Sequence, residues 1–424
     1  MQENNILKIS TSGSVDDGKS TLIGRILYDT NSLKRDQLEA IEKNSKQKGY
    51  DYLDFSLATD GLVAERKQGI TIDVAHIYFS TEKRSFIIAD TPGHKEYTRN
   101  MITGTSNSEI SLILIDARNG VIEQTKRHFF INNLLRLENI VVVVNKMDLI
   151  NYDENKFHKI VEDFMKLTEL ASYKTQKIHF IPISALHGEN VVESSEKLSW
   201  YKGKTLLQFL EEIQIQPSKT NQSRFQIQNV IRPKTEKYHD FRGYAGKLKG
   251  GELKVGDKIT VLPSQTNSKI KDIYFYNQTY KKAHPGSSIT ITLEDDVQID
   301  RGDMIVKQDE LPLESKQIKA VVCWMNQAPL EKNSFYWLQH GVKTVKSKIT
   351  DINSKIDIDQ MGKEQQTENL KLNDLGQIEL RLAQPLYFDD FKKNKDLGSF
   401  ILIDMKSNTT AGVGFFQENT LPVK

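Results

Sequence analysis

A glycine-rich segment near the amino terminus has the residue types needed to hold a phosphate chain. It reads Gly13-Ser14-Val15-Asp16-Asp17-Gly18-Lys19-Ser20 and fits the pattern G-x-x-x-x-G-K-[ST]. An apolar run precedes it and a helical pattern follows, so backbone N–H groups and the positive end of a helix can face phosphate oxygens. We expect Lys19 to reach the β- and γ-phosphates, with Thr21 adjoining the site, and the Ser20 hydroxyl to bind Mg²⁺.

A second motif predicts contacts with the γ-phosphate and the metal. Asp90-Thr91-Pro92-Gly93 follows a short strand-like run, so the Asp90 carboxylate can hold Mg²⁺ while the Gly93 N–H meets the phosphate. His94 comes directly after this turn. We predict that His94 orients the attacking water, although a lone histidine is more often packed or exposed to solvent.

Thr71 is a further candidate metal ligand. It lies within Gly69-Ile70-Thr71-Ile72-Asp73 and can supply a second hydroxyl to Mg²⁺ when the γ-phosphate is present. The alternative is that Thr71 is an ordinary strand residue. The preceding stretch, residues 34–68, is long and polar, which is typical of a mobile loop.

A third motif predicts that the base is guanine. Asn145-Lys146-Met147-Asp148 follows the most apolar strand-like run in the chain. The Asp148 carboxylate can accept both hydrogen bonds from N1 and N2 of guanine, and adenine offers no such pair. We expect Asn145 to bridge neighbouring loops, the Lys146 stem to lie along the base, and Ser184-Ala185-Leu186 to present a backbone N–H to guanine O6. The predicted ligands are therefore GTP and Mg²⁺.

The order of strand-like and helical patterns predicts the fold class. Residues 1–217 alternate between them, which indicates an α/β P-loop GTPase domain with a mostly parallel sheet and helices on both faces. Short strands broken by Gly, Pro and Asp turns follow, and they predict two β-barrel domains over residues 218–312 and 313–424. We expect 357–372 to be a surface loop and Asp389-Asp390 to be a solvated turn.

Composition narrows the class of protein. The chain has 424 residues, 38% hydrophobic and 27% charged, with a net charge of +2, so it is globular and composition gives no case for nucleic-acid binding. It has no signal-peptide pattern and no apolar run long enough to span a bilayer. The single cysteine, Cys323, sits in an apolar run and is expected to be buried. These features predict a cytoplasmic protein with no membrane contact.

The motifs resemble those of translation-factor GTPases such as elongation factor Tu. A closer resemblance is to the GTPase subunits of bacterial sulfate adenylyltransferases, because Ser14 and Asp17 stand where elongation factors typically carry histidine. Other segments that resemble the sulfate family are Asp60–Arg66, Tyr97–Met101, Asp240–Gly246, Leu382–Leu386 and Gly398–Asp404.

The resemblance implies an activity and a partner. In the sulfate family a small adenylyl-transferring subunit joins ATP to sulfate, which yields adenylyl sulfate and diphosphate, and the GTPase subunit couples GTP hydrolysis to that uphill reaction. By position, Val15 and Ile70 would flank the water held by His94. The resemblance implies that the adenylyl-transfer site lies in the partner, and we expect no carboxy-terminal kinase domain in this chain. The alternatives are an elongation-factor-like carrier of aminoacyl-tRNA and a regulatory GTPase without a metabolic partner.

Overall fold

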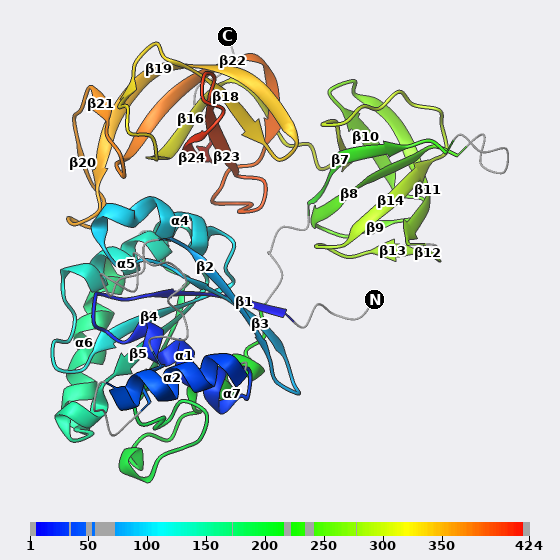
Figure 1. Ribbon diagram of the computed structural model, residues 1–424. Coiled ribbons are helices and arrows are strands. Elements are labelled where there is room, and N and C mark those ends of the chain that lie inside the picture. Colours follow the sequence, from blue (N-terminus) through cyan, green and yellow to red (C-terminus); the bar gives the residue numbers. More distant parts are fainter. Residues whose placement is uncertain are drawn as a thin grey trace. The chain divides into compact units, whose positions relative to one another are not determined.

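The apolar runs of the chain pair into one open sheet and two closed barrels, as seen in a computed structural model (Figure 1). The structure describes residues 6–33, 35–47, 53–55, 73–171, 173–215, 222–233, 241–276 and 278–418. The chain divides into unit 1, which comprises Met1–Ile215 and Asp357–Lys363, and unit 2, which comprises Gln216–Ile356 and Glu364–Lys424. The predicted fold class is confirmed, whereas the boundaries predicted at 217 and 312 stay predictions.

The sheet of unit 1 has the strand order β2-β3-β1-β4-β5-β6. Its strands are β1 Ile6–Ser12, β2 Ala75–Ser80, β3 Ser85–Asp90, β4 Ile110–Asp116, β5 Asn139–Asn145 and β6 Lys177–Pro182. Neighbouring strands run parallel except β2 and β3, which are antiparallel. Because the carboxyl ends of parallel strands meet at one edge, the loops after β1, β3, β5 and β6 gather there, and these loops hold the predicted nucleotide motifs.

Helices cover both faces of this sheet. They are α1 Lys19–Asp29, α4 Thr98–Ser106, α5 Glu123–Leu134, α6 Glu154–Leu170 and α7 Leu206–Glu212, with short 3-10 turns η2 Lys95–Tyr97, η3 Met147–Ile150 and η4 Glu196–Leu198. Successive residues of a strand point to opposite faces, so Leu112 and Val143 pack with α1 and α7, whereas Ile113 and Val142 pack with α5 and α6. Within the described residues, no helix combines the length and the apolar character needed to cross a membrane.

The expectation of a loop across residues 34–68 is wrong in part, because its beginning forms a helix, α2 (Arg35–Gln47). The helix is polar overall, but Leu38, Ile41 and Ser45 recur at spacings of three and four residues, and Ile41 and Ser45 are buried. An exposed ion pair between Arg35 and Glu39, at 3.1 Å, adds a small stabilisation of about 0.3 kcal/mol. So narrow an apolar stripe does not stand out in a polar sequence.

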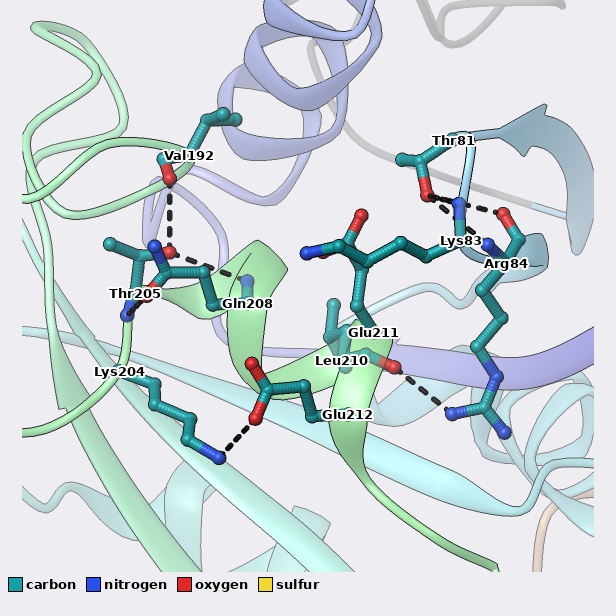
Figure 2. A network of polar contacts seen from close by, with 10 residues as sticks. All are labelled: Thr81, Lys83, Arg84, Val192, Lys204, Thr205, Gln208, Leu210, Glu211 and Glu212. Atoms are coloured by element: carbon teal, nitrogen blue, oxygen red, sulfur yellow. Dashed lines mark hydrogen bonds and ion pairs between the residues drawn. The ribbon is translucent and has the colours of Figure 1, made fainter.

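The last helix of unit 1 is held at its carboxyl end by the turn between β2 and β3 (Figure 2). Nη1 of Arg84 donates to the carbonyl oxygens of Leu210, at 3.1 Å, and Ile213, at 2.6 Å. The last carbonyl groups of a helix have no N–H donor within the helix. The positive guanidinium also interacts favourably with the negative end of the helix dipole. The neighbouring Lys83 pairs with Glu211 at 2.9 Å. Arg84 therefore ties α7 to the sheet.

The first barrel of unit 2 has the strand order β10-β15-β7-β8-β14-β11, and pairing of β10 with β11 closes it. The strands in this part of the chain are β7 Ser223–Ile231, β8 Gly243–Gly250, β9 Leu253–Lys254, β10 Lys258–Leu262, β11 Thr266–Phe275, β12 Gln278–Tyr280, β13 Lys282–Ala283, β14 Ser288–Leu293 and β15 Met304–Lys307. Apolar side chains such as Phe225, Ile259 and Ile291 fill its interior.

The second barrel has the order β18-β23-β24-β16-β22-β19, closed by β18 and β19. The strands in this part of the chain are β16 Leu313–Trp324, β17 Leu330–Glu331, β18 Phe335–His340, β19 Lys343–Asp357, β20 Lys363–Gln365, β21 Asn369–Leu370, β22 Leu375–Phe388, β23 Ser399–Asp404 and β24 Thr410–Gln417. The loop expected at 357–372 is therefore partly strand. All three residues of β20 are exposed, so the apolar alternation that reveals a strand in sequence is missing.

Asp389 and Asp390 are buried, which contradicts the expectation of a solvated turn. Asp389 Oδ1 pairs with Arg224 Nη2 at 3.0 Å, and its Oδ2 accepts a hydrogen bond from Asn394 Nδ2 at 2.8 Å. Asp390 accepts the backbone N–H groups of Lys392 and Glu418. Both carboxylates thus have fixed partners inside unit 2, as buried charges require. Cys323 is also buried, as expected.

Candidate nucleotide site

The glycine-rich segment forms the turn between β1 and α1. Gly18 has φ +90, and a Cβ atom there would lie 2.5 Å from Asn145 Nδ2, so only glycine fits. Nζ of Lys19 donates to the carbonyl oxygen of Gly13 at 3.0 Å. Burial lowers the pKa of Lys19, and the negative charge of Asp90 opposes that shift. A buried ammonium held by neutral carbonyls is well placed to receive an anion. Ser20 and Thr21 follow in the first turn of α1.

Asp17 stabilises this turn through the hydrogen bonds that its carboxylate and its carbonyl oxygen accept. Its Oδ2 accepts the backbone N–H of Ser14 at 2.5 Å, and its carbonyl oxygen accepts a hydrogen bond from Asn145 Nδ2 at 2.8 Å. Burial raises the pKa of the Asp17 carboxyl, and the Ser14 N–H opposes that shift. Val15 and Asp16, in the same turn, are exposed.

The Asp90–Gly93 turn lies directly against the glycine-rich segment. Thr11 Oγ1 donates to Asp90 Oδ1 at 2.8 Å, and Thr91 Oγ1 donates to the Thr11 carbonyl at 2.6 Å. Asp90, Thr91, Pro92 and Gly93 are all buried. A Cβ atom on Gly93 would lie 2.0 Å from the carbonyl oxygen of Gly13, so the two backbones approach more closely than any other residue would allow. The structure therefore brings these two predicted motifs together.

His94, unlike the buried residues of the Asp90–Gly93 turn, has a partly exposed side chain. Its side chain is 40% exposed, its Nδ1 accepts the backbone N–H of Glu96 at 3.4 Å, and its ring packs edge-on against Tyr97. Among the described residues, no hydrogen bond, ion pair or ring contact joins His94 to the Gly13–Ser20 turn. Thr71 and Ile70 lie outside the described residues.

The residues predicted to hold guanine meet at the ends of β5 and β6. Asn145 Oδ1 accepts the backbone N–H of Ala185 at 2.9 Å, and its Nδ2 donates to the Asp17 carbonyl, so Asn145 bridges two loops. Ser184 Oγ donates to Asp148 Oδ1 at 2.6 Å. Met147 is fully buried beneath them, and Leu186 is half-buried. This arrangement fixes the Asp148 carboxylate as an acceptor at the ends of these strands, which is what the N1 and N2 donors of guanine require.

Sequence reasoning missed Asp116. It ends β4 in register with Asn145, and its carboxylate pairs with Lys146 at 3.1 Å and Arg118 at 2.6 Å. Burial alone would raise the pKa of Asp116, but hydrogen bonds from Arg118 and the charge of Lys146 lower it to about 2. Asp116 thereby holds the Lys146 side chain in place. An aspartate at the end of a buried strand, beside the strand that carries N-K-x-D, is the signal that could have revealed it.

Comparisons with known proteins agree with this geometry. Residues 4–216 match the family described as the elongation factor Tu GTP binding domain, and residues 317–417 match the family described as GTP-eEF1A C-terminal domain-like. The fold and the site therefore define a GTP-binding protein of the translation-factor class.

Curated relatives identify the family within that class. The chain is 46% identical to sulfate adenylyltransferase subunit 1 of Colwellia psychrerythraea, over 96% of this chain and 87% of the relative. It is 44% identical to the protein of the same name from Bacteroides thetaiotaomicron, over 97% and 86% of the two chains, and 45% identical to that of Francisella tularensis, over 97% and 87%. The chain belongs to the sulfate adenylyltransferase subunit 1 family.

Proposed function

We propose that this chain is the GTP-hydrolysing subunit of a sulfate adenylyltransferase in sulfate assimilation. In that reaction a sulfate oxygen attacks the α-phosphorus of ATP, and the bond to the β-phosphate oxygen breaks, which yields adenylyl sulfate and diphosphate. The observation that carries the proposal is 46% identity over 96% of the chain to a protein of that name. This identity extends through both barrels, so it reaches well beyond the GTPase motifs shared with elongation factors. The aminoacyl-tRNA alternative is accordingly not retained.

In the proposed site, Gly13 to Thr21 hold the phosphates of GTP and Lys19 supplies the cation. Ser20 and Asp90 offer a hydroxyl and a carboxylate, which are the hard oxygen ligands that Mg²⁺ prefers, and Thr71 would add a second hydroxyl. Mg²⁺ bound with GTP would neutralise charge on the β- and γ-phosphate oxygens. Asn145, Lys146, Asp148, Ser184 and Ala185 would hold guanine.

For hydrolysis, we assign His94 to orient the attacking water, with Val15 and Ile70 as its apolar flanks. His94 follows Gly93, whose backbone lies against the Gly13–Ser20 turn (the phosphate turn), so this role requires the 40% exposed side chain of His94 to turn toward the γ-phosphate of bound GTP. Water attack on the γ-phosphorus then releases phosphate and leaves GDP.

The adenylyl transfer itself is assigned to a separate, small adenylyl-transferring subunit. The relatives are named subunit 1, which supports a partner, and we propose that the two chains form a heterodimer or a multiple of it. Such an assembly would work in the cytoplasm, where ATP and GTP are both available.

The proposal is tested by co-expressing this chain with a candidate small subunit. Diphosphate release from ATP and sulfate is then measured with and without GTP. GTP should accelerate release, and ATP plus sulfate should accelerate GTP hydrolysis. The matched control is Lys19→Ala, which should abolish tight GTP binding and the GTP-dependent release together, because it removes the cation assigned to the phosphates. GTP hydrolysis that is indifferent to partner and substrates would rule the proposal out.

A further inference from the structure

Three side chains on one face of α5 bind the segment that carries His94. Nε2 of Gln124 lies 3.1 Å from the carbonyl oxygen of Gly93, and Nε2 of His128 lies 3.2 Å from the same oxygen. Nη2 of Arg127 donates to Oγ1 of Thr98 at 2.7 Å. Positions 124, 127 and 128 are i, i+3 and i+4, so they project from the same side of the helix. The segment from Gly93 to Thr98 is thus fastened to α5 at both ends.

His128 is a fixed donor in this arrangement. The Gly93 carbonyl can only accept, so the proton must reside on Nε2, and Nδ1 is left buried without a partner among the described residues. Burial lowers the pKa of His128 to about 3, and the positive charge of Lys19 acts in the same direction. The lowered pKa favours the neutral imidazole, and the contact with the Gly93 carbonyl favours the tautomer that carries its proton on Nε2.

The carbonyl held by α5 belongs to the peptide bond that carries the backbone N–H of His94. On its opposite side, Gly93 is confined by the phosphate turn, because a Cβ atom would lie 2.0 Å from the Gly13 carbonyl oxygen and 3.2 Å from Lys19 Nζ. The Gly93–His94 peptide is therefore held between the phosphate turn and α5. The orientation of this peptide determines the position of the His94 Cα atom, from which the His94 side chain projects.

We propose that Gln124 and His128 are positioning residues for GTP hydrolysis, which hold the Gly93–His94 peptide so that His94 is presented to the attacking water. This inference rests on the role assigned to His94 in the proposed function. Neither residue touches the reacting atoms; both act through the backbone of Gly93.

The test uses variants that separate the donor from the side-chain volume. Gln124→Glu keeps the size but replaces the donor with a carboxylate, and Gln124 is only half-buried, so this variant should fold. His128→Leu removes the donor, whereas His128→Gln places an amide N–H near the position of Nε2 and should restore function. Lys126→Ala, on the exposed face of α5, is the matched control.

Single-turnover GTP hydrolysis should fall about tenfold in Gln124→Glu and in His128→Leu, as expected for loss of one hydrogen bond that is partly buried at Gln124 and buried at His128. The affinity for GDP, which lacks the γ-phosphate, should stay within about twofold of wild type, because the contacts assigned to its base and phosphates are untouched. His128→Gln and Lys126→Ala should hydrolyse GTP at close to the wild-type rate. Wild-type rates in both Gln124→Glu and His128→Leu would overturn the inference, and so would a parallel loss of nucleotide affinity.

Two further measurements separate this inference from the role of His94. Combining either variant with His94→Ala should cause no further loss of rate, since both act through one residue; additive losses would contradict the inference. Amide hydrogen exchange of residues 93–98 should rise in Gln124→Glu and His128→Leu and not in Lys126→Ala. If His94→Ala leaves hydrolysis unchanged, the role of His94 fails, and the exchange data still decide whether α5 holds the peptide.

Discussion

Nδ2 of the Asn145 side-chain amide donates to the carbonyl oxygen of Asp17 at 2.8 Å. This bond connects the Asn145–Asp148 segment, which is predicted to bind guanine, to the Gly13–Ser20 phosphate turn. The other end of the same amide accepts the backbone N–H of Ala185 at 2.9 Å. Asn145 is only 2% exposed, so water does not compete for these bonds. One side chain therefore orders the loops that follow β1, β5 and β6.

Replacing Asn145 with alanine should weaken GTP and GDP equally, by roughly 10- to 100-fold, because the loops around the nucleotide would lose the buried side chain that their backbone groups share. Titration of the purified variant with a fluorescent guanine nucleotide measures the loss. Asn155→Ala, an exposed asparagine at the start of α6, is the control. An unchanged affinity in Asn145→Ala would mean that the loops are ordered by other contacts.

Asp148→Asn should change which base is bound. The carboxylate accepts from Ser184 Oγ at 2.6 Å and has capacity left for the two donors of guanine. An amide presents a donor in place of one acceptor, which suits the C2 carbonyl of xanthine. We expect GTP affinity to fall by at least ~100-fold and xanthosine triphosphate to bind more tightly than GTP. Competition between the two nucleotides measures this, and a retained preference for GTP would refute the pocket.

The general position of the site could be predicted from the sequence because each motif follows its own strand. Parallel strands bring their carboxyl ends to one edge, so the phosphate turn, Asp90 and Asn145 had to meet there. Asp116 obeys the same rule, but its partner Lys146 comes from the adjacent strand and depends on the register of β4 with β5. Local sequence does not encode that register.

Contacts between distant segments were harder to predict. Arg224 and Asp389 are separated by 165 positions, so nothing near either residue indicates that both are buried. His128 and Gly93 are separated by 35 positions, and the residues next to His128, Arg127 and Phe129, do not indicate what it contacts. The α2 helix was missed for a different reason, because its few apolar residues carry a weak periodic signal.

The Asp116 carboxyl predicts a specific pH dependence of stability. Its pKa is about 2 in the folded chain and 3.8 as the ordinary value. A carboxyl group whose pKa is lower in the folded chain than in the unfolded chain stabilises the fold at any pH above the unfolded pKa of 3.8. This stabilisation is lost as the pH falls toward the folded pKa of about 2. The charge of Asp116 contributes on the order of 2 kcal/mol to the free energy of unfolding at neutral pH, and about half of this contribution should be lost at pH 3.

Urea unfolding of wild type and Asp116→Asn between pH 7 and pH 3 checks this prediction. The difference in the free energy of unfolding between wild type and Asp116→Asn should be largest at neutral pH and should shrink below pH 4. Only the wild type has a carboxylate at position 116, so only the wild type loses this stabilisation when the group is protonated. A difference that stays constant across the range would show that Asp116 titrates normally.

The ion pair between Arg224 and Asp389 should dominate the stability of unit 2. Both side chains are at least nine-tenths buried, at 1% and 8% exposure, so removal of either leaves a buried charge without its counterpart. Arg224→Met and Asp389→Leu should each lower the free energy of unfolding by about 3–5 kcal/mol, whereas the double variant should lose less than the sum. Guanine-nucleotide affinity, measured on the folded variants, should not change because its predicted residues lie in unit 1.

The control for this pair is Lys393→Ala, which removes an ion pair with Glu418 that is 2.9 Å long but exposed on both sides. It should cost less than about 1 kcal/mol because water screens both charges. Urea denaturation followed by tryptophan fluorescence compares the variants, since Trp324 is fully buried in the second barrel and reports on its unfolding. If Arg224→Met proved no more harmful than Lys393→Ala, Asp389 would behave as the solvated residue that its local sequence suggests.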